Sequence, residues 1–230
     1  MYIYGKNVAK EKIKSGEKIN KIYLAEKFND SEIMSLIKKY GIRYTFVPNK
    51  FLDNKVDGVH QGIILEVDEV ETFDFDYIKG INKKNPIIVL LDHIEDPHNF
   101  GAIIRTCEAL GIDGIIIPND RSVSINATVV KTSVGAIYNM PIIRVVNLAT
   151  TIKKLKDMGY WVVGTDMDGT DYTELDYNMP ICLIIGNEGK GMSRVLQDNC
   201  DFVAKIPMIG KINSLNASVS AGILIYRMDD

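Results

Sequence analysis

The stretch Ile-Ile-Val-Leu-Leu-Asp-His-Ile-Glu-Asp-Pro-His-Asn-Phe-Gly-Ala-Ile-Ile-Arg-Thr-Cys-Glu-Ala-Leu, residues 87–110, decides the fold. Its first five residues form a continuous apolar run, and its last nine carry apolar side chains at helical spacing. A strand that is apolar on both faces and is followed by an amphipathic helix is typical of a parallel sheet covered by helices. Ligands bind such sheets where the strands' carboxyl ends meet loops, so the residues after each strand are the functional candidates.

The same alternation of apolar strands and helices continues to the end of the chain and predicts an α/β domain over residues 86–230 with a mainly parallel sheet. Residues 1–75 alternate shorter segments and are expected to form a small separate α/β domain, joined by a polar linker at residues 76–85. The expected strands are 21–25, 43–47, 61–67, 87–91, 115–117, 142–145, 161–164, 182–185 and 202–206, and the expected helices are 8–14, 30–39, 102–110, 128–134, 148–158 and a last one from about residue 215.

The composition excludes several classes of protein. The chain has 46% hydrophobic and 25% charged residues, and no apolar run approaches the ~18 residues of a membrane span. The N-terminus lacks the layout of a secretory signal, so we expect a soluble, cytoplasmic protein with no membrane partner. Cys107, Cys182 and Cys200 form no CxxC pair, and the first two lie in apolar segments, which favours buried free thiols over a disulfide or a metal site.

The net charge of −3 alone argues against a nucleic-acid partner, but the charges are unevenly distributed. Residues 1–50 carry eleven Lys and Arg against five Asp and Glu, whereas residues 51–80 carry two against eight. This asymmetry indicates a basic N-terminal face that suits a nucleic acid. A solvated helical surface without a partner is the alternative interpretation.

The first candidate loop leads from the strand at 87–91 into the helix that carries Arg105. Asn99 and Arg105 are six residues apart, and both are expected at the mouth of the same site, where the start of a helix favours a phosphate or a developing negative charge. In the alternative interpretation, Asp96 or Asn99 only caps the helix and Arg105 forms a surface ion pair.

The second loop, Gly186-Asn187-Glu188-Gly189-Lys190-Gly191, follows the strand at 182–185. Its glycines let the backbone approach a ligand closely, and Glu188 places a carboxylate among them. The spacing fits neither a P-loop nor a dinucleotide-binding fingerprint, so a nucleoside triphosphate site is disfavoured. A structural turn without a ligand stays the alternative.

The third loop runs from Ile206 to the start of the last helix. Asn213, Ser214, Asn216 and Ser218 give that start more small polar groups than one helix cap needs, which indicates ligand contacts. The helix itself is apolar on nearly all sides, so it is expected to be buried or to pack against another subunit.

These loops, in this order and at these spacings, resemble the three signature motifs of the SpoU (TrmH-like) family of RNA 2'-O-methyltransferases in the SPOUT superfamily. The matching segments are Asn99-x-Gly101-x-x-x-Arg105, Ile185-Gly186-Asn187-Glu188-Gly189-x-Gly191, and Ile206-Pro207-Met208 with Ser214-Leu215-Asn216-Ala217-Ser218. Residues 4–8 and 60–63 are similar to the ends of the family's substrate-binding domain, an RNA-binding fold of the ribosomal protein L30e type.

The resemblance implies a SPOUT α/β-knot, in which the C-terminal segment forms a deep trefoil knot that binds S-adenosylmethionine. Gly186, Ile206 and Leu215 would contact this cofactor through their backbones. Other cofactor-binding candidates implied by the resemblance are Thr165, Asn187, Gly189, Met208, Ser214 and Asn216. It further implies a homodimer, with RNA crossing between the subunits, and no metal.

The catalytic residues implied by the resemblance are Asn99, Arg105, Glu188, Ser214 and Asn216. The family's usual proposal makes the residue at Arg105 the base, but a guanidinium with a pKa above ~12 is a poor proton acceptor. We therefore expect Arg105 either to give up its own proton transiently in a dry site and act as the base or, as we prefer, to stay cationic and stabilise the ribose 2'-oxygen while a phosphate or water takes the proton. Asn99 would position Arg105 or the ribose, and Glu188 would orient the Arg or the nucleotide.

Within the family, the N-terminal extension and the run Asn126-Ala127-Thr128 are most similar to enzymes that methylate a guanosine ribose in large-subunit (23S) ribosomal RNA. The expected activity is therefore transfer of a methyl group from S-adenosylmethionine to such a 2'-hydroxyl. A tRNA guanosine 2'-O-methyltransferase, an antibiotic-resistance methyltransferase and a catalytically inert RNA-binding homologue are the alternatives.

Overall fold

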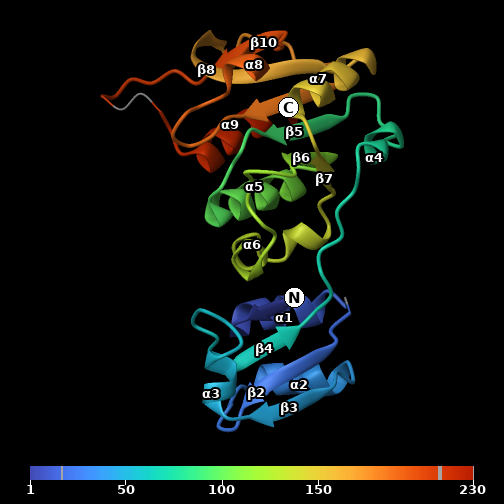
Figure 1. Ribbon diagram of the computed structural model, residues 1–230, viewed down its shortest axis with the longest axis vertical. Coiled ribbons are helices and arrows are strands. Elements are labelled where there is room, and N and C mark those ends of the chain that lie inside the picture. The colour runs from blue at the N-terminus through green and yellow to red at the C-terminus, as the bar shows by residue number, and fades with distance from the viewer. Residues whose placement is uncertain (17, 212–213, 230) are drawn as a thin grey trace.

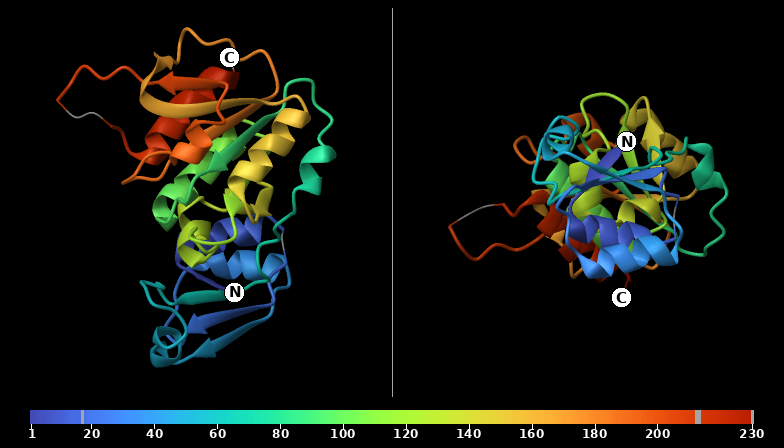
Figure 2. Two further views of the ribbon diagram at one scale, coloured as in Figure 1. Left: turned by 45° about the horizontal axis from the view of Figure 1, so that its top comes forward. Right: turned by 90° about the horizontal axis from the view of Figure 1, so that it is seen from below.

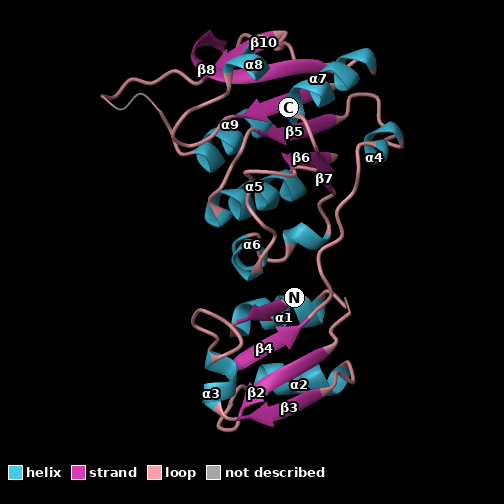
Figure 3. Ribbon diagram, viewed as in Figure 1, coloured by secondary structure: helices cyan, strands magenta, loops and turns pink. Residues whose placement is uncertain are grey.

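The computed structural model describes residues 1–16, 18–211 and 214–229, which fold into two regions, each built on its own sheet (Figures 1 and 3). The elements of the N-terminal region are β1 (Tyr2–Tyr4), α1 (Lys6–Lys14), β2 (Lys21–Ala25), α2 (Ser31–Lys39), β3 (Tyr44–Val47), α3 (Asn49–Asp53) and β4 (Ile63–Glu66). Its described residues form a mixed four-stranded sheet in the order β1-β4-β2-β3, in which only β2 and β3 run parallel. Because β3 is last in this order, one of its edges is open.

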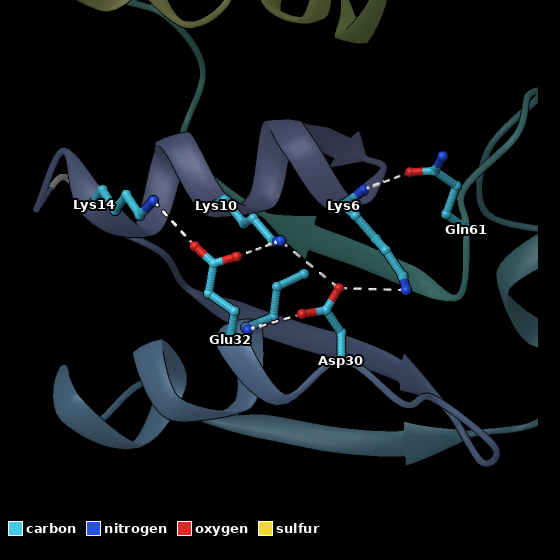
Figure 4. A network of polar contacts seen from close by, with 7 residues as sticks. Lys6, Lys10, Lys14, Asp30, Glu32 and Gln61 are labelled. Atoms are coloured by element: carbon cyan, nitrogen blue, oxygen red, sulfur yellow. Dashed lines mark hydrogen bonds and ion pairs between the residues drawn. The ribbon is translucent and has the colours of Figure 1, made fainter.

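Helices α1 and α2 cover one face of the N-terminal sheet and are joined by ion pairs (Figure 4). The Lys10 ammonium contacts Glu32 Oε2 at 2.6 Å, Lys14 contacts the other oxygen of Glu32 at 3.2 Å, and Lys6 contacts Asp30 at 3.3 Å. Asp30 also caps α2 by accepting from the backbone N–H of Ile33 at 3.1 Å. This bond and the nearby ammonium groups of Lys6 and Lys10 lower the pKa of the Asp30 carboxyl. Three of the N-terminal lysines are therefore neutralised by α2.

The C-terminal region is a parallel sheet with helices on both faces. Its elements, after the short α4 (Asp76–Lys79), are β5 (Ile87–Leu91), α5 (Pro97–Ala109), β6 (Gly114–Pro118), α6 (Ala127–Thr132), the 3-10 helix η1 (Ala136–Tyr138), β7 (Ile142–Val145), α7 (Leu148–Asp157), β8 (Trp161–Asp171), β9 (Ile181–Ile185), α8 (Arg194–Gln197), β10 (Phe202–Lys205) and α9 (Ala217–Asp229). The described residues pair as six parallel strands in the order β10-β8-β9-β5-β6-β7. This confirms the predicted α/β class.

The central strand β5 shows why its sequence is apolar throughout. Ile87, Val89 and Leu91 pack into the same cluster as the buried side chains of α5 and α9, whereas Ile88 and Leu90 pack with those of α7. Each such side chain, when fully buried, contributes about 1.5–3 kcal/mol. The buried thiols of Cys107 and Cys182 lie in these two clusters as predicted, and burial raises the pKa of both.

The prediction that helix α5 begins at Ala102 is wrong. The Asp96 side chain accepts from the backbone N–H groups of His98 and Asn99 at 3.1 and 3.3 Å, and Pro97 occupies the first helical position. An acidic cap followed by proline is a strong start signal, because proline lacks the N–H that would otherwise go unpaired. Asn99 therefore lies in the first turn of α5 rather than in the loop before it.

The connection between the two regions joins the C-terminal sheet at Phe73, whose backbone exchanges 2.8 Å hydrogen bonds with β7 at Ile142 and Arg144. The domain limits at residues 75 and 86 stay predictions, and so does the trefoil knot, because strand order and register do not specify how the chain threads. No helix in the described part of the chain is long and apolar enough to cross a bilayer.

Candidate active site

Three predicted site residues, one from each loop, are joined by side-chain hydrogen bonds. The Asn99 amide Nδ2 donates to Glu188 Oε1 at 2.9 Å, and Asn99 Oδ1 accepts from Asn216 Nδ2 at 2.8 Å. Asn99 is only 8% exposed, whereas Glu188 and Asn216 are open to solvent. Since the two bonds use opposite ends of the Asn99 amide, they fix its orientation. We call these residues the polar chain.

Asn216 also caps helix α9. Its Oδ1 accepts from the backbone N–H of Ser218 at 2.9 Å and of Val219 at 3.3 Å, and from the Ser218 hydroxyl at 2.5 Å. Part of the polar character at the start of α9 is therefore structural. The predicted candidates Ser214 and Leu215 lie exposed just before it, and Asn213 falls outside the described residues.

The loop after β9 closes on itself and is tied to the loop after β5. Asn187 exchanges backbone hydrogen bonds with Gly191, accepts at Oδ1 from the backbone of Gly189 at 3.0 Å, and donates from Nδ2 to the His93 carbonyl at 2.8 Å. The Asn187 side chain is thus engaged inside the protein. Its predicted cofactor contact stays a prediction.

Gly186 has a structural reason to be glycine. A Cβ there would collide with the backbone of Met192 and would lie 2.5 Å from the Gly191 carbonyl carbon. A Cβ at Gly189, in contrast, would come no closer than 3.7 Å to Asn187 Oδ1. The loop therefore approaches itself at Gly186 and is open to a ligand at Gly189.

Sequence reasoning overlooked Asp92 and His93, which hold this loop in place. Asp92 is 2% exposed, accepts from the Ser193 backbone N–H at 2.7 Å, and contacts His93 Nδ1 at 2.6 Å. His93 has a φ of 58°, which a residue other than glycine seldom adopts. The available signal was an aspartate directly after an apolar strand, the position where buried carboxylates organise neighbouring loops.

The strand order brings two of the predicted cofactor-binding residues to one edge of the sheet. β10, β8 and β9 are neighbours and parallel, so Ile206 and Gly186, which directly follow β10 and β9, lie at the same edge of the sheet. Thr165 does not follow a strand, as the predicted strand 161–164 implied, because β8 continues to Asp171 and Thr165 lies inside it. The Thr165 hydroxyl donates to the Ile184 carbonyl at 3.2 Å. Beyond Ile206, residues 207–211 lead away from the body of the domain, and Met208 is 38% exposed there (Figures 1 and 2).

This edge presents both polar and apolar groups to solvent. It offers the open backbone at Gly189, exposed apolar side chains at Met208 and Leu215, and the carboxylate of Glu188. Ligand sites of this kind combine an apolar surface with a few placed polar groups.

Arg105 does not join the polar chain, contrary to expectation. Six residues along an α-helix move a side chain about 9 Å along the axis and about 120° around it, so Asn99 and Arg105 face different directions. Arg105 is exposed and lines a cavity of about 590 Å³ between the two regions of the molecule. Within the described residues no carboxylate pairs with Arg105, so the alternative of a surface ion pair is not met either.

The same cavity contains a buried lysine and a strained backbone. The Lys12 ammonium of α1 lies 3.3 Å from the centre of the Tyr138 ring, across the interface between the regions, and burial lowers its pKa to about 8. The Tyr138 hydroxyl is buried with no hydrogen-bond partner among the described residues, and burial raises its pKa to about 12. Val134, also in the lining, has a φ of 53°, which is costly for a β-branched residue.

Residues 86–226 match the SpoU rRNA Methylase family, and residues 2–73 match the family described as RNA 2'-O ribose methyltransferase substrate binding. The chain belongs to the SpoU family. Together the two matches cover both regions of the structure, so this is a SpoU-family RNA 2'-O-ribose methyltransferase with a substrate-binding domain at its N-terminus.

The SpoU chain matches two of the following proteins over nearly its whole length and a third over part of it. It is 46% identical over 234 residues to YacO of Bacillus subtilis (strain 168), a protein assigned to the TrmH family of tRNA/rRNA methyltransferases, covering 99% of this chain and 94% of YacO. The AdoMet-bound rRNA methyltransferase from Sinorhizobium meliloti is 25% identical, with a TM-score of 0.75 over 99% of this chain and 85% of that one. The TrmH/SpoU tRNA-modifying enzyme of A. aeolicus is 30% identical with a TM-score of 0.59, over 64% of this chain and 75% of that one.

Proposed function

We propose that this SpoU enzyme methylates the ribose 2'-hydroxyl of a guanosine in large-subunit (23S) ribosomal RNA. The methyl transfer rests on the polar chain, which joins the three signature loops at the carboxyl edge of the sheet. The choice of ribosomal RNA rests on extent: similarity to an rRNA methyltransferase covers 99% of the chain, and similarity to a tRNA-modifying enzyme covers 64%. The part of the chain that the tRNA-modifying enzyme does not match is about the size of the substrate-binding domain.

S-adenosylmethionine is the methyl donor in this proposal, and it supplies a methyl group activated by a positively charged sulfur. Gly186, Ile206 and Leu215 would hold it through backbone groups at the shared edge of β9, β8 and β10. The other residues proposed to bind it are Thr165, Asn187, Gly189, Met208, Ser214 and Asn216. Holding two reactants in line lowers a barrier by several kcal/mol, up to roughly 7–11 in favourable cases, so positioning is the main task of these residues.

The polar chain would position the ribose. Asn99 cannot turn without breaking one of its two hydrogen bonds, and Glu188 is left with its second oxygen directed away from that bond. Glu188 and Asn216 are exposed, so both are accessible to a nucleotide. Ser214, in the adjoining loop, would add a hydroxyl contact to the cofactor and the substrate.

Arg105 would stabilise the 2'-oxygen while a phosphate or water takes its proton. We propose that Arg105 of one subunit acts on the ribose held by the polar chain of a second subunit. In one chain Arg105 and Asn99 are on different faces of α5. Helix α9 packs on α5 and leaves Val219 49% and Tyr226 63% exposed, about two turns apart on the same side. A homodimer formed through this surface would place a second copy next to α5.

The experiment that tests the proposed substrate is a map of 2'-O-methyl sites in total RNA from cells with and without the gene. The expected result is loss of one mark on the large ribosomal RNA, restored by the purified protein and S-adenosylmethionine. Loss of a mark on transfer RNA instead would overturn the ribosomal substrate and leave the methyltransferase activity intact.

A further inference from the structure

Residues 38–52 of the substrate-binding domain, Lys-Lys-Tyr-Gly-Ile-Arg-Tyr-Thr-Phe-Val-Pro-Asn-Lys-Phe-Leu, carry four cations and no Asp or Glu. They span the end of α2, the strand β3 and most of α3. Strand β3 is the last in its sheet and lies at the end of the molecule away from the methyltransferase domain (Figures 1 and 2). We call the exposed side chains of residues 38–51 the β3-edge surface.

Aromatic side chains on this surface are unusually open to solvent. Tyr40, Tyr44, Phe46 and Phe51 are 44%, 39%, 48% and 37% exposed. Tyr44 and Phe46 are two residues apart on the strand, so they project from the same face, and their rings meet edge to face at 5.7 Å. A contiguous exposed apolar patch marks an interaction site, and nucleic-acid bases stack on aromatic rings of this kind.

The cations of the β3-edge surface are unpaired, unlike those on α1. Lys38, Lys39, Arg43 and Lys50 are exposed, and none has a carboxylate partner in the described part of the chain. Lys10 and Lys14, in contrast, share the carboxylate of Glu32 (Figure 4). The positive excess of the N-terminal region is therefore available to a ligand at the β3 edge and largely neutralised on α1.

We propose that the β3-edge surface binds an unpaired segment of the RNA substrate, with bases stacked on Tyr44 and Phe46 and phosphates at the four cations. This inference rests on the proposed function. It adds a second contact with the RNA substrate, at the end of the molecule away from the methyltransferase domain. An open strand edge also suits pairing with a second copy of the chain. Two edges with four unpaired cations each would repel, so the charge favours a polyanion.

The first test removes charge at two places in the same domain. Lys39→Gln with Arg43→Gln takes two unpaired cations from the β3 edge, and the control, Lys10→Gln with Lys14→Gln, takes two neutralised cations from α1. Binding of a fluorescein-labelled 12-nucleotide single-stranded RNA is measured by anisotropy from 50 to 300 mM salt. We expect Kd to rise about ten-fold or more for the β3-edge variant and less than two-fold for the control, and the salt slope to fall by roughly 0.7 per lost phosphate contact.

The second test removes the aromatic faces and keeps the apolar bulk. Tyr44→Leu with Phe46→Leu should weaken single-stranded RNA about ten-fold and change binding of a 12-base-pair RNA duplex less than two-fold, because duplex bases are already stacked. Thermal melts of each variant confirm folding. Equal losses for the single strand and the duplex would overturn the stacking role, and unchanged RNA binding in both β3-edge variants would overturn the inference.

Two further readouts separate this inference from the proposed function and from self-association. Methyl transfer by the wild type to total RNA is measured independently. If the wild type transfers no methyl group but the β3-edge variants lose RNA binding, the proposed function fails and the RNA surface stands. If sedimentation shows that Tyr44→Leu with Phe46→Leu abolishes self-association while RNA affinity is unchanged, the surface is a contact between copies and the inference is overturned.

Discussion

The two halves of helix α5 serve different parts of the molecule. At the N-terminal end Asn99 is buried and fixed by hydrogen bonds to Glu188 and Asn216, whereas Arg105, less than two turns later, is exposed in the cavity between the domains. A motif that is compact in sequence is divided by the geometry of the helix that carries it. The difference teaches that a single chain assembles only part of the proposed catalytic group.

The largest effect should come from a substitution in the exposed C-terminal half of α5. Arg105→Ala is expected to lower kcat/KM for RNA methylation by roughly 10³-fold, because one charge that stabilises a developing oxyanion is lost. Binding of S-adenosylmethionine, measured by calorimetry, should stay within a few-fold of the wild type. Arg105→Lys should not restore activity, since an ammonium lacks the planar donor fork. Near-normal turnover in Arg105→Ala would remove this residue from the mechanism.

A substitution in the buried N-terminal half of α5 should have the next largest effect on activity. Asn99→Ala breaks both hydrogen bonds of the polar chain and is expected to lower kcat by about 10²-fold, because the ribose is no longer held in line. Asn178→Ala is the matched control, as it breaks a 2.7 Å bond between Asn85 and Asn178 elsewhere on the surface. Equal activity in the two variants would show that the polar chain is structural only.

Asp92 tests whether the loop after β9 must be held in place. Asp92→Asn is expected to lower the free energy of unfolding by about 1–3 kcal/mol, because an NH2 donor replaces one of the two buried oxygens that contact Ser193 and His93. Cofactor affinity should fall about ten-fold as the loop loosens. The control Asp53→Asn alters a similar contact, to His60 at 3.0 Å, at an exposed site. Unchanged cofactor affinity in Asp92→Asn would separate the loop from the cofactor site.

The smallest effect concerns the interface between the domains. Burial lowers the pKa of Lys12 from 10.5 to about 8, so the folded protein disfavours its charged form. Stability from this group is then greatest above pH 10.5 and is lost as the pH falls through 8. The melting temperature of the wild type, relative to Lys12→Met, should therefore rise by a few degrees between pH 8 and 10.

The control for Lys12 is Lys55→Met, which removes a less buried ammonium that lies 4.6 Å from the Tyr2 ring. A wild-type melting temperature that does not rise relative to Lys12→Met between pH 8 and 10, or that rises equally relative to Lys55→Met, would contradict burial of the Lys12 ammonium.

The sequence predicts some elements with their bounds and misses others for physical reasons. The strands β2 and β5 begin and end where their apolar runs do. Strand β1 has only three residues and exists because it pairs with β4, about 60 residues later, so no local pattern marks it. Asp96-Pro97 marks the early start of α5 in the sequence, although the prediction places a loop there.

In the candidate site, too, some features could be predicted from the sequence and others could not. The meeting of Asn99, Glu188 and Asn216 could be predicted from their places after strands, because parallel strands carry their loops to one edge. The separation of Arg105 could not, since it depends on where α5 begins and on the domain packed beside it. The neutralisation of the α1 lysines likewise depends on α2, which lies about 20 residues away in sequence.

The most direct test of the divided site is complementation between two inactive variants. Purified Arg105→Ala and Asn99→Ala chains are mixed, allowed to exchange subunits, and assayed for methyl transfer to RNA. If Arg105 of one subunit serves the polar chain of the other, each mixed dimer regains one intact site, and activity should reach about a quarter of the wild type. Activity no higher than that of the separate variants, in a mixture shown to contain mixed dimers, would contradict the account.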